Sequence, residues 1–144
     1  MKKLLVPIDG SGAALRALQQ AIALAKLSGA ASLHLVHAHE EPLIYGEVAV
    51  YVPRAKMEEW QRVNSEGLLA AAEAAAGLKD SGVRYTKEAL IGPVGETIAR
   101  HAERLGCDAI VMGRHGKSTI GDLFMGSVAM KVLHLTRLPV LLVR

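Results

Sequence analysis

Two short segments near the end of the chain combine glycine with polar residues at a spacing that suits a bound phosphate. The first is Gly113-Arg114-His115-Gly116, and nine residues separate it from Gly126-Ser127, which precedes a helical pattern. Glycine lets backbone N–H groups turn toward one point and lets a ligand approach the chain closely. The first N–H groups of a helix that begins at Ser127, together with its dipole, favour an anion. Two clusters of donors on one loop therefore predict a polyphosphate site.

The charges of this loop favour the same interpretation. Arg114 and Lys117 are basic, and Asp122 is the single acidic residue between the two glycine segments. An alternative remains open, in which the loop only caps a helix, uses its glycines for tight turns and binds nothing.

A further polar segment follows the first apolar run of the chain. The run Leu4-Leu5-Val6-Pro7-Ile8 is uniformly apolar, as expected for a strand buried on both faces, and it ends at Asp9-Gly10-Ser11-Gly12. Ala38-His39-Glu40 follows the second predicted strand in the same way. Ligands of open parallel sheets bind beyond the carboxyl ends of the strands, where the strand order reverses. We therefore expect Asp9 to lie near the glycine loop.

These segments are positioned by alternating strands and helices. Strands are predicted at 4–8, 32–38, 83–90, 108–112 and 139–143. Helices are predicted from Ser11 to Gly29, over 53–80, from Gly92-Pro93 to 105, and over 127–135. The inward face of the 53–80 helix is predicted to carry Met57, Trp60, Val63, Gly67, Ala71, Ala74 and Leu78. Such alternation predicts an α/β fold, with right-handed crossovers onto a mostly parallel sheet covered by helices on both faces.

Length and composition restrict the class of protein. The 144 residues suit a single domain, and 51% hydrophobic with 22% charged residues predicts a folded globular chain. The net charge of +3 is mild and aromatic residues make up 3%, so we expect no nucleic-acid partner. The only cysteine is Cys107, which excludes an internal disulfide. The apolar run at 4–8 is too short for a secretion signal or a membrane helix, which predicts a soluble cytoplasmic protein without membrane partners.

The motifs resemble those of the universal stress protein family, in its ATP-binding subgroup. The resemblance rests on Val6-Pro7-Ile8-Asp9-Gly10-Ser11, Leu35-Val36-His37-Ala38, Val111-Met112-Gly113-Arg114-His115-Gly116, Gly126-Ser127-Val128-Ala129 and Leu138-Pro139-Val140-Leu141-Leu142-Val143. It covers residues 1–144 as one domain. It implies an open five-stranded parallel sheet of order 3-2-1-4-5, similar to the adenine nucleotide alpha hydrolases, with helices on both faces.

The resemblance also implies a nucleotide site. Its members here are Pro7, Ile8, Asp9, Ala38, Met112, Gly113, Arg114, His115, Gly116, Gly126, Ser127 and Val128. By this resemblance, Asp9 faces the ribose or a phosphate-bound Mg²⁺, and the backbone of Ala38 contacts the adenine edge. Ala129 replaces a hydroxyl residue that many nucleotide-binding members carry. Because the lost hydroxyl removes a donor, the resemblance leaves open whether ATP, ADP or AMP is the ligand.

A homodimer is expected as well. In the order 3-2-1-4-5 the last strand is an edge, and Val140 to Val143 is uniformly apolar. Such an edge favours pairing with its own twofold copy. The implied role is regulatory. ATP would order the Gly113 to Gly126 loop and bias a dimer surface that an unidentified regulatory protein partner reads.

Other functions are weaker alternatives. A slow ATPase or a nucleotidyl transferase on the same fold remains open, with Asp122 as a group to position water, and no catalytic residue is assigned. A nicotinamide or flavin site is disfavoured because Gly10-Ser11-Gly12 lacks the third glycine of that motif. Strand alternation places His37 and His39 on one face and His34 on the other, so a metal site would need a third ligand from elsewhere, and solvent-facing or strand-end histidines are the favoured interpretation. No metal ligand is assigned.

Overall fold

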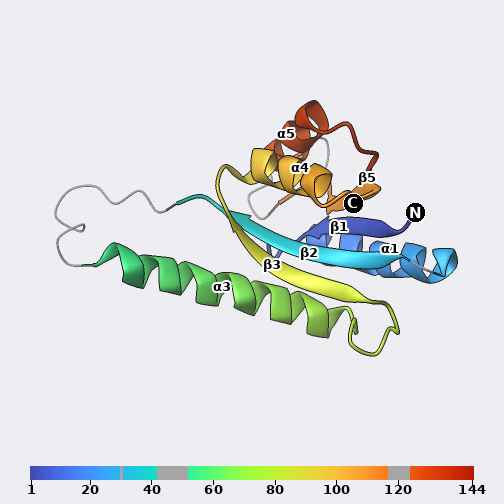
Figure 1. The fold of residues 1–144 in the computed structure, drawn as a ribbon, viewed down its shortest axis with the longest axis horizontal. Helices are drawn as coiled ribbons and strands as arrows, with labels where there is room; N and C mark the ends of the chain where they lie inside the picture. Colours follow the sequence, from blue (N-terminus) through green and yellow to red (C-terminus); the bar gives the residue numbers. More distant parts are fainter. Residues whose placement is uncertain (30, 42–51, 117–123) are drawn as a thin grey trace.

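The fold is built on a five-stranded sheet in which each strand runs parallel to its neighbours. The computed structural model describes residues 1–29, 31–41, 52–116 and 124–144. The strands are β1 (Lys3–Pro7), β2 (Ser32–His39), β3 (Tyr85–Ile91), β4 (Ala109–Gly113) and β5 (Val140–Val143). Their order is β3-β2-β1-β4-β5, which confirms the predicted fold (Figure 1).

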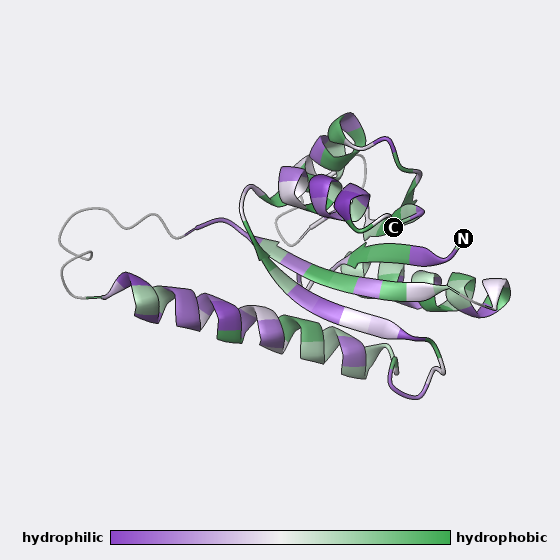
Figure 2. Ribbon diagram, viewed as in Figure 1, coloured by the Kyte–Doolittle hydropathy of each residue, from purple (hydrophilic) through white to green (hydrophobic). Residues whose placement is uncertain are grey.

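Helices cover both faces of this sheet. They are α1 (Gly12–Ser28), α3 (Arg54–Ala75), α4 (Val94–Arg104) and α5 (Ser127–Leu135). Figure 1 shows α4 and α5 together on one side of the sheet, with α1 and α3 on the other. Leu4 and Val6 belong to the core on the α1 side, whereas Leu5 belongs to the core on the α4 side. Burial on both sides explains why β1 is apolar without alternation (Figure 2).

The ends of α1 follow the predicted capping chemistry. Ser11 Oγ accepts a hydrogen bond from the Ala14 backbone N–H at 3.1 Å. Gly29 ends the helix in the left-handed conformation, with φ +69°. The helix therefore begins directly after Asp9-Gly10 and points its N-terminus toward the end of β1.

The 53–80 helix is shorter than predicted. It ends at Ala75, because Gly77 adopts φ +62° and the Leu78 N–H donates to the Glu73 carbonyl at 3.0 Å. The Gly77 N–H donates to the Ala74 carbonyl, which completes a Schellman cap. The predicted end at residue 80, before Ser81-Gly82, therefore lies five residues too far along the chain.

The predicted inward face of this helix is also wrong, except for Leu78, which is buried but lies beyond the helix end. Trp60 is 54% exposed and Val63 is 55% exposed, while the buried positions are Ser65, Leu69 and Glu73. The first turns of α3 extend beyond the sheet, so their apolar side chains have no core to enter (Figure 1). The buried polar residues have partners on strands, Ser65 with His39 and Glu73 with Tyr85 and Lys87.

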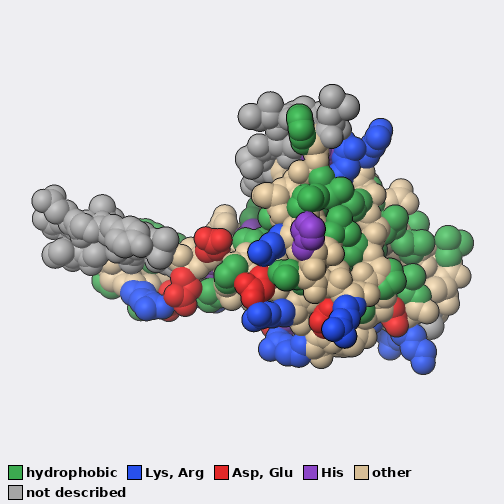
Figure 3. Space-filling model, turned by 90° about the horizontal axis from the view of Figure 1, so that it is seen from above, with side chains coloured by type: hydrophobic (Ala, Val, Ile, Leu, Met, Phe, Trp, Pro, Cys, Tyr) green, Lys and Arg blue, Asp and Glu red, His purple; other side chains and the backbone are tan. Residues whose placement is uncertain are grey.

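The two edges of the sheet differ in character. β3 carries a hydrophilic stretch, whereas β5 is apolar (Figure 2). Leu141 of β5 is 44% exposed, and Met130 and Leu133 of α5 are 43% and 41% exposed. Figure 3, which views the molecule from the α4–α5 side, shows hydrophobic side chains gathered on this face. No helix among the described residues is both long and apolar enough to cross a bilayer.

Candidate functional site

A pocket lies beyond the carboxyl ends of β1 and β4, where the strand order reverses. Eleven of the twelve predicted site residues line it. They are Pro7, Ile8, Asp9, Ala38, Met112, Gly113, Arg114, His115, Gly116, Ser127 and Val128. The structure thus brings together residues from β1, β2, β4 and the start of α5, which are far apart in the sequence.

The twelfth residue, Gly126, joins the two glycine segments instead of lining the pocket. Its N–H donates to the Arg114 carbonyl at 2.8 Å. A Cβ at this position would lie 3.2 Å from the same carbonyl oxygen, which is closer than most real contacts. Glycine therefore lets the start of α5 approach the segment after β4. Lys117 and Asp122 lie outside the described residues.

Asp9 faces the glycine segment after β4. Its Oδ1 accepts a hydrogen bond from the Ser11 N–H at 2.8 Å, which fixes the carboxylate. A Cβ at Gly116 would lie 3.1 Å from Asp9 Oδ2. The second carboxylate oxygen therefore lies directly against Gly116, at the polar end of the pocket. An ionised carboxylate of this kind is a suitable ligand for a hard cation such as Mg²⁺.

Gly113 allows α1 to pack on the end of β4. A Cβ at Gly113 would lie 2.9 Å from both the carbonyl carbon and the Cβ of Ala13, and 3.0 Å from the Ala14 nitrogen. The first turn of α1 thus occupies the space that a side chain would need. This packing places Ala14 in the pocket wall, next to the ends of both strands.

His115 lines the pocket and carries a buried donor. Arg114 Nε donates a hydrogen bond to His115 Nε2 at 2.9 Å, so the neutral ring carries its proton on Nδ1. This Nδ1 is buried and has no hydrogen-bond partner among the described residues. Since an unpaired buried donor costs roughly 1–3 kcal/mol, a ligand acceptor at this point would be favourable.

The N-terminus of α5 supplies a second group of donors. Gly126 occupies the N-cap position and provides no side-chain hydrogen bond to the helix. Ser127 and Val128, the first helical residues, line the pocket. The first N–H groups of a helix have no acceptor within it and carry partial positive charge. This end of the pocket is therefore suited to an anion.

Several pocket residues were missed by the sequence prediction. Ala14, Val94 and Ile98 also line the pocket, as does Ala129, which the sequence placed in the second phosphate segment without assigning it to the site. Val94 and Ile98 fall on the apolar face of α4, and no pattern in the sequence separates a core position from a pocket wall. Gly95 brings this helix against α5, because a Cβ there would lie 2.7 Å from the Lys131 Cβ.

His37 supports the pocket from the opposite face of the sheet. Its Nδ1 donates to the Ile8 carbonyl at 2.7 Å, and the Ile8 N–H donates to the Val36 carbonyl, also at 2.7 Å. Both groups of the Ile8 backbone are thereby fixed to β2. Burial and the neighbouring His37 ring lower the pKa of His39, whose Nδ1 lies 3.2 Å from Ser65 Oγ.

Comparison with known proteins identifies the family. The sequence profile of the universal stress protein family matches residues 1–144. Universal stress protein YxiE of Bacillus subtilis is 34% identical over 99% of this chain and 98% of its own length. The solved structure of MJ0577 from Methanocaldococcus jannaschii superposes with a TM-score of 0.82 and 29% identity, over 99% of this chain and 94% of that chain.

A further solved structure contains a ligand. A universal stress protein crystallised in complex with cAMP has a TM-score of 0.71 and 26% identity, over 99% of this chain and 97% of that chain. The fold, the strand order and the full-length matches all agree. This chain belongs to the universal stress protein family.

Proposed function

We propose that the pocket binds an adenine nucleotide, with ATP and Mg²⁺ as the expected ligand, and that the protein is a nucleotide-linked regulatory homodimer of the stress-response type. The observation that carries the proposal is the meeting of three groups at one pocket. His115, whose buried Nδ1 has no partner among the described residues, the first residues of α5 and Asp9 all line it. Two of them attract phosphate oxygens, and the third suits a cation bound to phosphate.

The direction of the Ala38 backbone supports a contact with the adenine edge. Alternate residues of a strand direct their N–H and C=O groups toward the same neighbouring strand. The Val36 carbonyl bonds to Ile8 at the end of β1, so the backbone groups of Ala38 point to the same side, beyond that end. The His39 carbonyl, by contrast, bonds to Gly92 on the β3 side. A family member that binds cAMP supports an adenine ligand for this end of the pocket.

A direct connection joins the pocket to the proposed dimer strand. The Arg114 N–H, at the first step of the phosphate loop, donates to the Val143 carbonyl of β5 at 2.8 Å. Pairing β5 with its copy would cover the exposed Leu141 and remove the apolar edge. A nucleotide bound at Arg114 thereby affects the position of β5, the strand proposed to pair in the dimer. The regulatory partner protein would bind the surface of that dimer.

Nucleotide titration tests the proposal. We expect the wild type to gain about 2.7 kcal/mol of stability at a ligand concentration of 100 Kd, measured by thermal unfolding with ATP, ADP, AMP and Mg²⁺. Gly116→Val, Gly126→Val and His115→Phe should reduce this gain, each relative to its own ligand-free midpoint. Equal stabilisation of all variants, or none with any nucleotide, would contradict the proposal.

Single-turnover hydrolysis separates a regulator from an ATPase. A protein that only binds ATP releases no phosphate above background, either as wild type or as Asp9→Ala. Phosphate release by the wild type that Asp9→Ala abolishes would favour the slow ATPase instead.

A further inference from the structure

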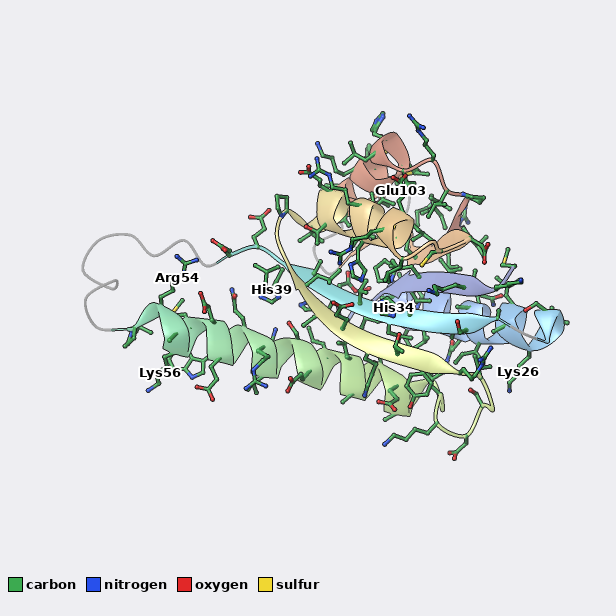
Figure 4. All side chains as sticks on the ribbon, viewed as in Figure 1. Lys26, His34, His39, Arg54, Lys56 and Glu103 are labelled. Carbon is green, nitrogen blue, oxygen red and sulfur yellow. The ribbon has the colours of Figure 1, made fainter. Side chains whose placement is uncertain are left out.

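Three potential metal ligands meet on the α4 side of the sheet, away from the nucleotide pocket. His34 comes from β2, Glu88 from β3 and His101 from α4. Within the described ranges, this is the one group of at least three histidine, cysteine or acidic residues whose ligand atoms all lie within 4.8 Å of one another. Figure 4 shows His34 well before the carboxyl end of β2, where His39 lies.

The fold fixes these three side chains independently of any ligand. His34 and Glu88 belong to paired strands, because His34 is opposite Thr86 and Val36 is opposite Glu88. His101 is 4% exposed and follows the buried Ile98 by one turn of α4. The two ligands that His34 lacked therefore come from a strand and a helix more than fifty residues further along the chain.

The distances among the ligand atoms match a tetrahedral ion. Glu88 Oε2 lies 3.2 Å from His34 Nε2 and 3.0 Å from His101 Nε2, and the two Nε2 atoms lie 3.2 Å apart. A Zn²⁺ ion with tetrahedral bonds of roughly 2.0–2.1 Å separates its ligand atoms by about 3.3 Å. The triangle therefore requires adjustments of only a few tenths of an ångström.

We propose that His34, Glu88 and His101 form a Zn²⁺ site with an open fourth position. Two imidazoles and one carboxylate are a ligand set that zinc accepts, and a water or a substrate atom then completes the coordination. His101 lines a surface pocket with Thr97 and Arg100, and the Glu88 side chain is 44% exposed. The cluster is therefore open to solvent at Glu88.

The neighbours of the two rings predict how the site changes on metal binding. When zinc occupies Nε2, each ring keeps its proton on Nδ1 and needs an acceptor there. The Thr86 hydroxyl contacts His34 Nδ1 and provides one. Arg104 lies 2.7 Å from His101 Nδ1 and has only donors, so it must withdraw. The Arg104 side chain is exposed and free to turn into solvent.

Calorimetric titration of the tag-free full chain with Zn²⁺ tests the site, and Co²⁺ serves as a spectroscopic substitute. We expect one ion per chain, with visible absorption bands typical of tetrahedral Co²⁺. Replacing a residue that only hydrogen-bonds to a metal ligand weakens metal binding by roughly 10–100-fold. His34→Asn and Glu88→Gln remove ligands themselves, so each should weaken Zn²⁺ binding by more than that. The matched control is His134→Asn, an exposed histidine of α5, which should bind like the wild type.

Arg104→Ala provides a test with the opposite sign. Because it removes the competing donor, it should tighten Zn²⁺ binding, whereas a merely structural cluster would bind no better. Glu88 is partly exposed, so its variant should keep the wild-type circular dichroism spectrum even if replacement of the buried His101 prevents folding. Absence of stoichiometric binding, or unchanged affinity in both ligand variants, would leave only a hydrogen-bonded cluster and overturn the proposal.

Discussion

The contact between β4 and α1 makes a quantitative prediction for Gly113→Ala. The added Cβ would lie 2.9 Å from the Ala13 carbonyl carbon and 3.0 Å from the Ala14 nitrogen. Both are backbone atoms of a helix, so no flexible side chain can move aside. Gly113 has no positive φ, and the predicted cost therefore comes from space alone. Overpacking of this kind costs about 1–3 kcal/mol.

The corresponding change in melting temperature follows from the length of the chain. The entropy of unfolding is about 2.1 cal/mol/K per residue, or roughly 0.3 kcal/mol/K for this protein. We expect Gly113→Ala to lower the Tm by about 3–10 °C in differential scanning calorimetry. The same displacement moves Ala14 in the pocket wall, so the affinity for ATP should fall as well.

Gly67→Ala is the matched control. Gly67 is an exposed position within α3, and a Cβ there meets no atom within 4 Å. Alanine is favoured over glycine in a helix by roughly 0.8–1 kcal/mol, so the identical substitution should raise the Tm by about 3 °C. If both variants shifted the Tm in the same direction, the close packing of α1 on Gly113 would be refuted.

Three further outcomes can be measured. Hydrogen bonds from Lys87 and Tyr85 hold the pKa of Glu73 below its usual value, so this residue contributes stability above about pH 5 that is lost as the pH falls. The free energy of unfolding, measured by denaturation between pH 6 and 3, should therefore depend less on pH in Glu73→Gln than in the wild type. The exposed Glu59→Gln should keep the wild-type pH dependence. Burial raises the pKa of the Cys107 thiol, so a thiol reagent at pH 8 should react with it rapidly only after unfolding. Leu141→Glu places a charge on the β5 edge, and light scattering should then detect a monomer for the variant and the proposed dimer for the wild type.

The parallel sheet was predictable because its central strands are buried on both faces. β1 and β4 contain runs such as Leu4-Leu5-Val6 and Ile110-Val111-Met112, and all six of these residues are at most 4% exposed. Local signals also set the ends of α1, since Ser11 and Gly29 form their capping hydrogen bonds with residues three or four positions away. A strand or a helix end can therefore be predicted from the sequence where it depends on residues close to it in the chain.

The inward face of α3 depends on partners that are distant in the sequence. Ser65 and Glu73 are buried because His39, Tyr85 and Lys87 supply hydrogen bonds from two strands. A hydrophobic pattern cannot reveal such positions, and it selected Trp60 and Val63 instead. The pocket walls on α1 and α4 escaped prediction for a related reason, because a core contact and a ligand contact require the same apolar side chains.

The two proposed sites share the α4 side of the sheet but occupy different parts of β2. His34 is the third residue of that strand and Ala38 the seventh, which separates them by about 13 Å along an extended chain. α4 spans both regions, with Ile98 in the pocket wall and His101 in the zinc cluster. If α4 stays fixed on the core, zinc affinity should be equal with and without ATP. If zinc instead changes the affinity for ATP, linkage requires ATP to change the affinity for zinc by the same factor, and α4 would be the element that carries the effect.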